Sequence, residues 1–318
     1  MSRPITIEDI RSAADLVSPH VHRTPLSENR TVGERLGRRV SLKLELLQKA
    51  GSFKPRGAFN EVLHLSSAQR ERGVVGVSGG NFAQGLAYAG QTLGVPVRII
   101  MPAGTPANYV EATRGYGAEV EIAPTIAEAF ARADAYAAAG VAALHPFDDP
   151  HMMAGNGTVG LEIAEDAPDA TDIFVAIGGG GLMTGVATAV EALLPGARVW
   201  GVETEGADAM RRALDAGEVV EMQPTSIAKT LAAPWVSEAT LQAAQTLLDD
   251  VLVVPDEAAF RALVFLLERA KLLTEPAASC TLAAAESVRD RLGDHVVLIL
   301  CGGNTSLGDL RSWAQKFG

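Results

Sequence analysis

The feature that most constrains the fold is an alternation of short runs rich in valine and isoleucine with longer segments of helical period. The short runs occupy residues 40–45, 74–77, 97–101, 119–122, 141–144, 173–177, 198–203, 251–254 and 296–300. Alanine-rich segments at 82–93, 125–139, 183–194 and 276–292 have the spacing of helices. This alternation predicts an α/β fold in which open, twisted, mostly parallel sheets are flanked by helices.

Three of the predicted strands end in glycine-dense segments. These are Ser-Gly-Gly-Asn at 78–81, four consecutive glycines at 178–181 and Cys-Gly-Gly-Asn at 301–304, and each leads into a helical pattern. Ligands of α/β proteins collect outside the carboxyl ends of the strands, where loops enter helices. We therefore expect the functional site to lie at these three strand ends.

Composition excludes several classes of partner. The net charge of −11 disfavours binding to nucleic acid or to an anionic membrane. No run approaches the roughly 18 apolar residues of a membrane span, and residues 1–10 lack the apolar core of a signal peptide. Two cysteines, Cys280 and Cys301, form neither a disulfide framework nor a zinc motif. We expect a soluble protein of the reducing cytoplasm.

The four glycines at 178–181 are typical of an anion-binding loop. Their backbone N–H groups can surround an anion, and the N-terminus of the following helix adds partial positive charge. A dinucleotide motif GxGxxG fails, because its last position falls on Met183 or Thr184, and no Lys-Ser/Thr pair completes a nucleotide P-loop. The loop fits a small phosphate group, with a tight structural turn as the alternative.

Lys54 is the most informative of only six lysines. It lies between Phe53 and Pro55, and we expect it in the first turn of a helix that runs to Leu65, where proline is tolerated. The positive end of the helix dipole lowers the pKa of an amine at this position. A lysine that forms a Schiff base needs this, because only the neutral amine attacks a carbonyl. The alternative is a surface lysine near a helix start.

Taken together, these motifs resemble the fold-type II pyridoxal-phosphate (PLP) enzymes, in the branch of serine/threonine dehydratases (threonine ammonia-lyases) and serine racemases. The matching segments, in order along the chain, are 22–26 (His-Arg-Thr-Pro-Leu), 42–48, 51–54 (Gly-Ser-Phe-Lys), 78–85, 154–158, 178–181, 202–203, 275–276 and 301–304. The resemblance covers nearly the whole chain, and it implies the tryptophan synthase β-like fold. It is much less specific for the substrate.

The resemblance also implies roles for individual residues. Lys54 would carry PLP as a Schiff base and then take the Cα proton of the substrate. The cofactor would further contact Phe53 and Asn81 at its ring, Gly178, Gly179, Gly180, Gly181 and Leu182 at its phosphate, and Cys301 at its pyridine nitrogen. The substrate would bind to Ser78, Gly79, Gly80, Asn81 and Phe82, its carboxylate held by backbone N–H groups and the Ser78 hydroxyl. For Cys301, a small buried hydrophobic residue is the alternative interpretation.

Two departures from the branch pattern bear on the reaction. Gly79 stands where the racemases of the branch have a serine that reprotonates the opposite face of Cα, so elimination is favoured over racemisation. Phe82 replaces the usual histidine, which would enlarge the apolar surface near the substrate. We predict an ammonia-lyase that dehydrates a small amino acid such as L-threonine or L-serine to a 2-oxo acid and ammonia. The alternatives are a lyase for a bulkier substrate of the phenylserine or hydroxyaspartate type, a serine racemase, a β-replacement synthase and a non-catalytic binding protein.

Further departures argue against a divalent cation, which relatives often bind. Glu203 and Ala207 fit the pattern, but Ala209 stands where an acid is needed, with Asp208 one residue away as the only substitute. We therefore predict no metal site. Lys229 replaces an aspartate of the branch, and is either solvated or a substitute for the cation charge. Glu275 either lies near the cofactor or caps the helix that begins at the following proline.

The resemblance finally implies two domains and an assembly. Residues 1–72 and 149–318 would form the larger, PLP-binding domain, and residues 73–148 a smaller inserted domain that closes over the substrate. Because the chain ends soon after Cys301, we expect no regulatory domain of the kind that biosynthetic threonine deaminases append. A homodimer is the habit of the family.

Overall fold

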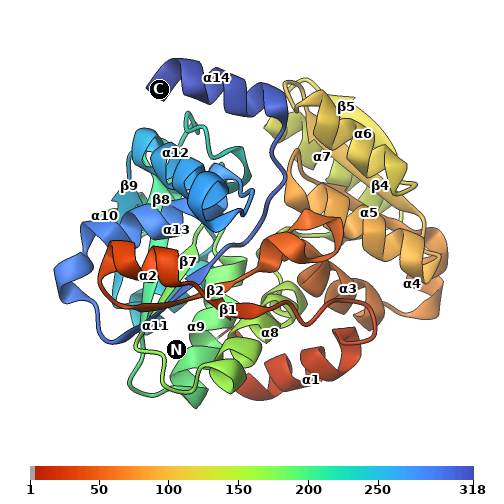
Figure 1. Cartoon of the computed structure of the whole chain (residues 1–318). Coiled ribbons are helices and arrows are strands. Elements are labelled where there is room, and N and C mark those ends of the chain that lie inside the picture. The colour runs from red at the N-terminus through yellow and green to blue at the C-terminus, as the bar shows by residue number, and fades with distance from the viewer. Residues whose placement is uncertain (1–3) are drawn as a thin grey trace.

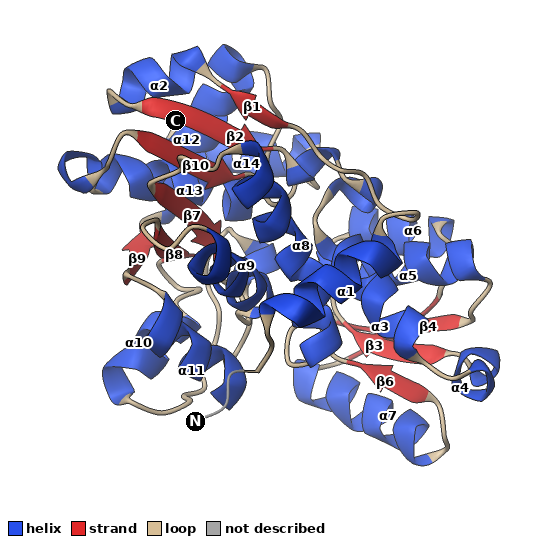
Figure 2. Ribbon diagram, turned by 90° about the horizontal axis from the view of Figure 1, so that it is seen from below, coloured by secondary structure: helices blue, strands red, loops and turns tan. Residues whose placement is uncertain are grey.

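The computed structural model describes residues 4–318, which form two β-sheets with helices packed around them (Figure 1). The strands are β1 (Leu26–Glu28), β2 (Arg39–Lys43), β3 (Val74–Val77), β4 (Val97–Pro102), β5 (Glu119–Ala123), β6 (Ala142–Leu144), β7 (Asp172–Ala176), β8 (Arg198–Thr204), β9 (Asp250–Val254) and β10 (His295–Ile299). The larger sheet has the order β1-β2-β10-β7-β8-β9 and the smaller the order β5-β4-β3-β6. Figure 2 shows the two sheets as separate groups of strands.

The described helices cover both sheets. They are α1 (Ile7–Val17), α2 (Arg30–Leu36), α3 (Lys54–His64), α4 (Ser67–Arg72), α5 (Asn81–Leu93), α6 (Ala107–Gly115), α7 (Ile126–Ala138), α8 (Pro150–Asp166), α9 (Gly181–Leu193), α10 (Ala209–Ala216), α11 (Glu238–Leu247), α12 (Asp256–Phe265), α13 (Pro276–Ser287) and α14 (Leu307–Phe317). Short 3₁₀ turns at Glu45–Leu47, Lys49–Gly51, Lys229–Leu231 and Arg289–Arg291, and a π-helical turn at Leu266–Ala270, join them. None of the helices within residues 4–318 is both long and apolar enough to cross a membrane.

The predicted α/β fold with two mostly parallel sheets is confirmed. Each strand pairing is parallel except that of β1 with β2. All nine predicted strands occur with small shifts at their ends. Because β1 is only three residues long and largely exposed, it has no apolar run and escaped prediction. The last predicted helix ends at Ser287 rather than at 292. The charged residues that follow it form a short 3₁₀ turn and are exposed to solvent.

The polypeptide passes between the sheets twice. It enters the smaller sheet through α4 and leaves it through the segment 145–149, which joins β6 to α8. We call residues 145–149 the return crossover. The smaller sheet is built wholly from residues 74–144, but the division into two domains at 72/73 and 148/149 stays a prediction. Residues 1–3, the start of the predicted larger domain, lie outside the described residues.

A buried network of charges fixes helix α3, which begins with Lys54. The Arg56 guanidinium is fully enclosed, and its Nε lies 2.8 Å from Glu45 Oε2 and its Nη1 2.7 Å from Glu162 Oε1. The Lys43 ammonium, also fully buried, pairs with the same Glu162. Charges leave water only when partners compensate them. The network therefore ties β2, α3 and α8 together at a defined position.

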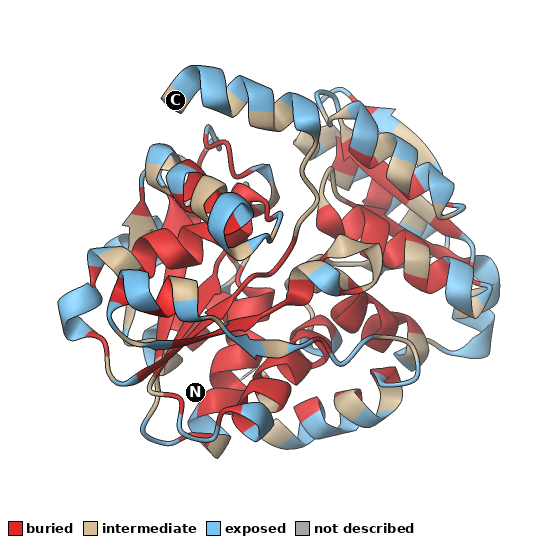
Figure 3. Cartoon of the chain, viewed as in Figure 1, coloured by how far each residue is buried: buried red, intermediate tan, exposed pale blue. Residues whose placement is uncertain are grey.

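Helix α5 of the smaller sheet packs closely against the start of α3. A Cβ added to Gly85 would lie 3.0 Å from the carbonyl carbon of Lys54, so the approach requires glycine. The central strands β3, β7 and β10 are buried, whereas α14 at the C-terminus is largely exposed (Figure 3). The first turn of α3 thus lies in the interior, between parts of the chain that carry the two sheets.

Candidate active site

The segment that precedes α3 is clamped to the loop that follows β10. The Phe53 N–H donates to the Cys301 carbonyl at 3.0 Å, and Gly303 N–H donates to the Gly51 carbonyl at 3.0 Å. The Asn304 amide extends the clamp, because its Nδ2 donates to Asn81 Oδ1 at 2.8 Å. The loops after β3 and β10 therefore meet at the start of α3, as their glycine-dense sequences predicted.

Lys54 is the first residue of α3, in the first helical turn as expected. Its Nζ donates to the Pro146 carbonyl of the return crossover at 2.6 Å and lies 5.1 Å and 5.7 Å from the ring centroids of Phe53 and Phe82. Burial lowers the pKa of Lys54 to about 8, while Glu61 acts in the opposite direction. The expected fall in pKa occurs, and removal from water is its largest cause.

The four glycines after β7 form a cradle at the N-terminus of α9. Gly180 adopts φ +97°, and a Cβ there would lie 2.6 Å from Thr240 Cβ. A Cβ on Gly181 would lie 3.0 Å from the backbone of Phe147, and one on Gly179 would enter the ring of Phe147. Side chains are thus excluded from the loop, which leaves the unpaired N–H groups of the helix start facing the site. The residues present fit a compact anion such as the phosphate of PLP.

The return crossover brings the cradle and the lysine together. Pro146 accepts the hydrogen bond of Lys54, and the next residue, Phe147, packs on Gly179 and Gly181. Leu182, at the start of α9, is buried beneath the loop. A cofactor with an aldehyde to be held by an amine and a phosphate to be held by backbone N–H groups therefore fits this part of the chain.

A buried carboxyl group, Glu275, joins three of the loops. Its Oε1 accepts hydrogen bonds from Asn81 Nδ2 and from Thr230 Oγ1, both at 2.8 Å, whereas its Oε2 is buried without a partner. Burial raises the pKa of Glu275 to about 7, and these two hydrogen bonds oppose the shift. Glu275 does occupy the N-cap position of α13, and its carbonyl accepts from Ala278 N–H and Ser279 N–H, but its carboxyl group makes no capping hydrogen bond and turns to Asn81 and Thr230 instead.

The loop after β3 contains two consecutive glycines, Gly79 and Gly80. A Cβ on Gly79 would lie 2.5 Å from Thr105 Oγ1, so a serine at this position would need Thr105 to move. The Ser78 hydroxyl accepts a hydrogen bond from Gly80 N–H at 3.1 Å, which tightens the turn. The ring of Phe82 is 2% exposed and packs in the core of the smaller sheet. Its neighbour at the site is Lys54, whose Nζ lies 5.7 Å from the ring centroid.

Cys301 follows β10 and is buried. Burial raises the pKa of its thiol well above the usual range, with the charge of Glu275 as the next cause. The thiol is therefore neutral and can offer only a weak hydrogen bond. This is consistent with both interpretations of Cys301 from the sequence.

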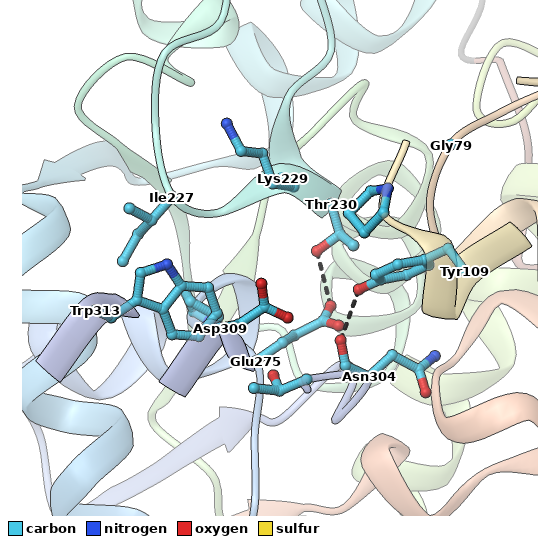
Figure 4. Close-up of a pocket in the computed structure, with 12 residues that line it drawn as sticks. Gly79, Tyr109, Ile227, Lys229, Thr230, Glu275, Asn304, Asp309 and Trp313 are labelled. Atoms are coloured by element: carbon cyan, nitrogen blue, oxygen red, sulfur yellow. Dashed lines mark hydrogen bonds between the residues drawn. The ribbon is translucent and has the colours of Figure 1, made fainter. Parts of the chain in front are cut away.

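A pocket opens beside Glu275 (Figure 4). It is lined by Gly79, Pro106, Tyr109, Ile227, Lys229, Thr230, Glu275, Pro276, Asn304, Thr305, Asp309 and Trp313. Figure 4 shows Thr230 and Tyr109 directed towards Glu275 and Asn304, and Tyr109 Oη donates to the Asn304 carbonyl at 2.6 Å. Of the predicted site residues only Gly79 lines this pocket.

Several residues of the pocket escaped the sequence analysis, among them Tyr109, Thr230 and Trp313. Tyr109 on α6 and Trp313 on α14 belong to ordinary amphipathic helices, and no local pattern distinguishes them. Thr230 follows Lys229 in a segment that departs from the branch pattern, and that departure was the available signal. Lys229 itself is exposed, its amine points away from Glu275 in Figure 4, and it forms no ion pair with the residues described.

The carboxylate of Glu203, which the sequence suggested as a possible metal ligand, is hydrogen-bonded to backbone N–H groups. Glu203 accepts hydrogen bonds from the N–H groups of Met210 and Arg211, both at 2.8 Å, at the start of α10. Asp208 binds the Arg212 guanidinium at 3.0 Å. Residues 4–318 contain no group of three or more His, Cys, Asp or Glu side chains placed to hold a metal ion.

Comparison with known proteins identifies relatives over nearly the full chain. Residues 17–302 match the family described as pyridoxal-phosphate dependent enzyme. The chain is 40% identical to the L-threonine ammonia-lyase of Thermotoga maritima over 309 residues, which cover 94% of this chain and 76% of that protein. It is 35% identical to the L-threo-3-hydroxyaspartate ammonia-lyase of Saccharomyces cerevisiae, with 95% and 94% covered.

Solved structures agree with these relatives. The fold superposes on maize serine racemase with a TM-score of 0.91 at 33% identity, covering 98% of each chain. It superposes on a threonine deaminase from T.th. with a TM-score of 0.90 at 39% identity, covering 95% of this chain and 99% of that one. The resemblance and the fold type inferred from the sequence motifs are confirmed.

Proposed function

Because this chain belongs to the family of pyridoxal-phosphate-dependent enzymes, we propose that it is an ammonia-lyase that converts a β-hydroxy amino acid such as L-threonine or L-serine into a 2-oxo acid and ammonia. The observation that carries the proposal is the enclosed amine of Lys54, whose pKa is lowered to about 8 beside a glycine-built anion cradle. An amine with a pKa of about 8 is neutral in roughly one molecule in ten at pH 7, far more often than an ordinary lysine, so it can act as nucleophile and as base.

We assign the residues that hold PLP as follows. Lys54 would hold its aldehyde carbon, residues 178–182 its phosphate, Phe53 and Asn81 its ring, and Cys301 its pyridine nitrogen. When bound, PLP supplies the electron sink that makes loss of the Cα proton feasible. The neutral thiol of Cys301 supports elimination, because it does not hold a full positive charge on the ring nitrogen as an aspartate would.

The chain's own residues orient the substrate and move its proton. The backbone N–H groups of the loop 78–82, with the Ser78 hydroxyl, bind the substrate carboxylate. Lys54 Nζ takes the Cα proton, the Cβ–oxygen bond breaks, and one proton passes to the hydroxyl, so that it leaves as water. Addition of one water molecule to the resulting enamine then gives the 2-oxo acid and ammonia. Enclosure by the two sheets excludes bulk water from Lys54 during this step.

Elimination is supported over racemisation by the geometry at Gly79. A racemase needs a second acid–base group on the opposite face of Cα. Gly79 has no side chain, and the close approach of Thr105 leaves no space for one without a shift. The Thermotoga relative is named as a lyase and not as a racemase.

A second candidate is the same reaction on a bulkier β-hydroxy amino acid, of the phenylserine or hydroxyaspartate type. The rings of Tyr109 and Trp313 line the pocket and offer apolar surface to a larger side chain. The yeast relative is named for 3-hydroxyaspartate. We also propose that the protein is cytoplasmic, since its two cysteines are free and buried. We propose a homodimer from the resemblance to its family, and light scattering tests it.

The proposal is tested by locating the cofactor and assaying the product. Borohydride reduction of the PLP-loaded protein, followed by peptide mapping, should place the adduct on Lys54. Release of 2-oxo acid is then measured from serine, threonine, phenylserine and hydroxyaspartate. An adduct on another lysine, or none, would overturn the assignment, and chiral analysis of serine after incubation would reveal racemisation.

A further inference from the structure

An acidic residue, Glu61, shares a helix face with Lys54. Glu61 lies seven residues after Lys54 on α3, two helical turns along, so the two side chains leave the helix on the same side. Both face the return crossover. Lys54 Nζ bonds to the Pro146 carbonyl at 2.6 Å, while the backbone of His145 and the charge of Asp149 act on Glu61.

Glu61 is buried without a well-formed hydrogen bond. Its side chain is enclosed, the residue is 3% exposed, and neither Oε1 nor Oε2 has a partner in hydrogen-bond geometry. By contrast, Glu45 and Glu162 on the other side of α3 pair with Arg56. A buried carboxyl group without a well-formed hydrogen bond destabilises the fold, because the loss of water is not compensated in full. Packing therefore does not account for Glu61.

The charge that opposes this burial is that of Lys54. Burial raises the pKa of Glu61 well above its usual range, Asp149 raises it further, and Lys54 and the His145 backbone lower it. For Lys54, Glu61 is the largest influence that favours the ammonium form. His145 is neutral: burial lowers its pKa, and its Nδ1 accepts a hydrogen bond from Asp148 N–H at 2.8 Å. Each of the two buried groups is thus ionised most readily when the other is.

We infer that Glu61 is a positioning residue for Lys54, whose negative charge stabilises the Lys54 nitrogen in its protonated form. The inference rests on the proposed function, in which Lys54 takes a proton from the substrate Cα. That proton moves from Cα to Nζ, and no atom is transferred to Glu61. The pair then carries one positive and one negative charge in a site from which water is excluded, where an isolated ammonium would be strongly disfavoured.

The test replaces the carboxyl group with a neutral group of the same size, in Glu61→Gln. In the PLP-loaded protein, the pH at which the absorbance band of the bound cofactor changes should fall by roughly one unit, since removal of a nearby opposite charge lowers the pKa of the cation. The pH at which kcat/KM changes on the basic side of its pH profile should fall with it. Glu165→Gln, which removes an exposed carboxylate from α8, should leave both unchanged.

A second measurement does not need the bound cofactor. Competitive labelling of the cofactor-free chain with acetic anhydride at several pH values, read by mass spectrometry, gives the pKa of Lys54 itself. That pKa should also fall in Glu61→Gln, whereas thermal stability should be unchanged or higher because an unsatisfied acid has been removed. If glutamine prevents folding, Glu61→Met makes the same test.

Two kinds of failure are distinguishable. If the unchanged protein binds no cofactor or releases no 2-oxo acid, the proposed function fails. If the unchanged protein does both, yet Glu61→Gln titrates at the same pH as the unchanged protein by both measurements, then Glu61 does not act on Lys54 and the inference is overturned. A loss of stability without a shift in titration would identify a purely structural role and would overturn it equally.

Discussion

Helix α3 carries two buried cations, two residues apart, in opposite environments. Arg56 lies within hydrogen-bonding distance of two carboxylates, and their charges raise its pKa despite complete burial. Lys54 has a single carbonyl as its hydrogen-bond partner at 2.6 Å, and burial lowers its pKa to about 8. Residues two apart leave a helix on nearly opposite sides, so one helix can hold both environments.

The difference separates stability from chemistry. A cation whose charge is fully compensated fixes the position of the helix and cannot change its protonation state. A cation that lacks such compensation costs stability, but its amine can exchange protons near neutral pH. We interpret Arg56 as the group that holds α3 in place so that Lys54 is presented to the site.

The largest effect is expected when Lys54, the cation without compensating charge, is replaced. Lys54→Ala should lower kcat by about 10³-fold or more, because both the covalent attachment of PLP and the base are lost. The free energy of unfolding should be little changed, since the hydrogen bond to Pro146 and the charge opposite Glu61 are lost but an unfavourably buried ammonium is removed as well. Steady-state kinetics and urea unfolding measure the two effects, with Lys316→Ala, an exposed lysine, as control. Substantial residual activity would show that another amine is the base.

The opposite pattern is expected for Arg56. Arg56→Met should lower the free energy of unfolding by about 3–5 kcal/mol, because Glu45 would be left buried without its ion-pair partner and Glu162 would keep only Lys43. Urea denaturation measures the loss, and activity at low temperature should persist in the folded fraction. Arg30→Met, which removes an exposed ion pair with Glu34, serves as a matched control and should cost little. Equal stability of the two variants would contradict the role assigned to the network.

A smaller effect is expected at the anion cradle. Gly180→Ala introduces a side chain at φ +97°, where L residues are strained, and 2.6 Å from Thr240 Cβ. The strain should cost about 1–3 kcal/mol of stability. Titration with PLP, followed by absorbance, should show roughly tenfold weaker binding, which corresponds to about 1.4 kcal/mol of this strain opposing binding of the cofactor. Gly196→Ala, where a Cβ meets nothing within 4 Å, is the control.

Local chemistry made part of this site predictable. Strand ends, glycine runs and the proline after Lys54 are local signals, and the structure brings the loops at 78–81 and 301–304 together as they indicated. The partners of Arg56 were not predictable, because Glu162 lies 106 residues away and no spacing rule connects them. The hydrogen bond from Lys54 to Pro146 is likewise a consequence of how the return crossover packs.

The lysine itself shows how a correct expectation can rest on an incomplete cause. Position in the first turn of a helix led us to expect a lowered pKa from the helix dipole. The largest cause is burial, which depends on α5, the return crossover and the smaller sheet all closing around the side chain. Sequence alone carries no measure of that enclosure.

The comparison between compensated and uncompensated charges extends to Glu275, whose pKa is raised by burial from 4.5 to about 7. Between these two pH values the unfolded chain has lost the proton that the folded protein still holds, so ionisation of Glu275 lowers stability as pH rises through this window. Glu275→Gln keeps an oxygen that can accept from Asn81 and Thr230 but cannot ionise. Relative to the unchanged protein, the variant should therefore gain roughly 1–3 kcal/mol in the free energy of unfolding between about pH 5 and about pH 8. Urea denaturation at both pH values measures this change, and a difference independent of pH would show that Glu275 does not titrate in that range.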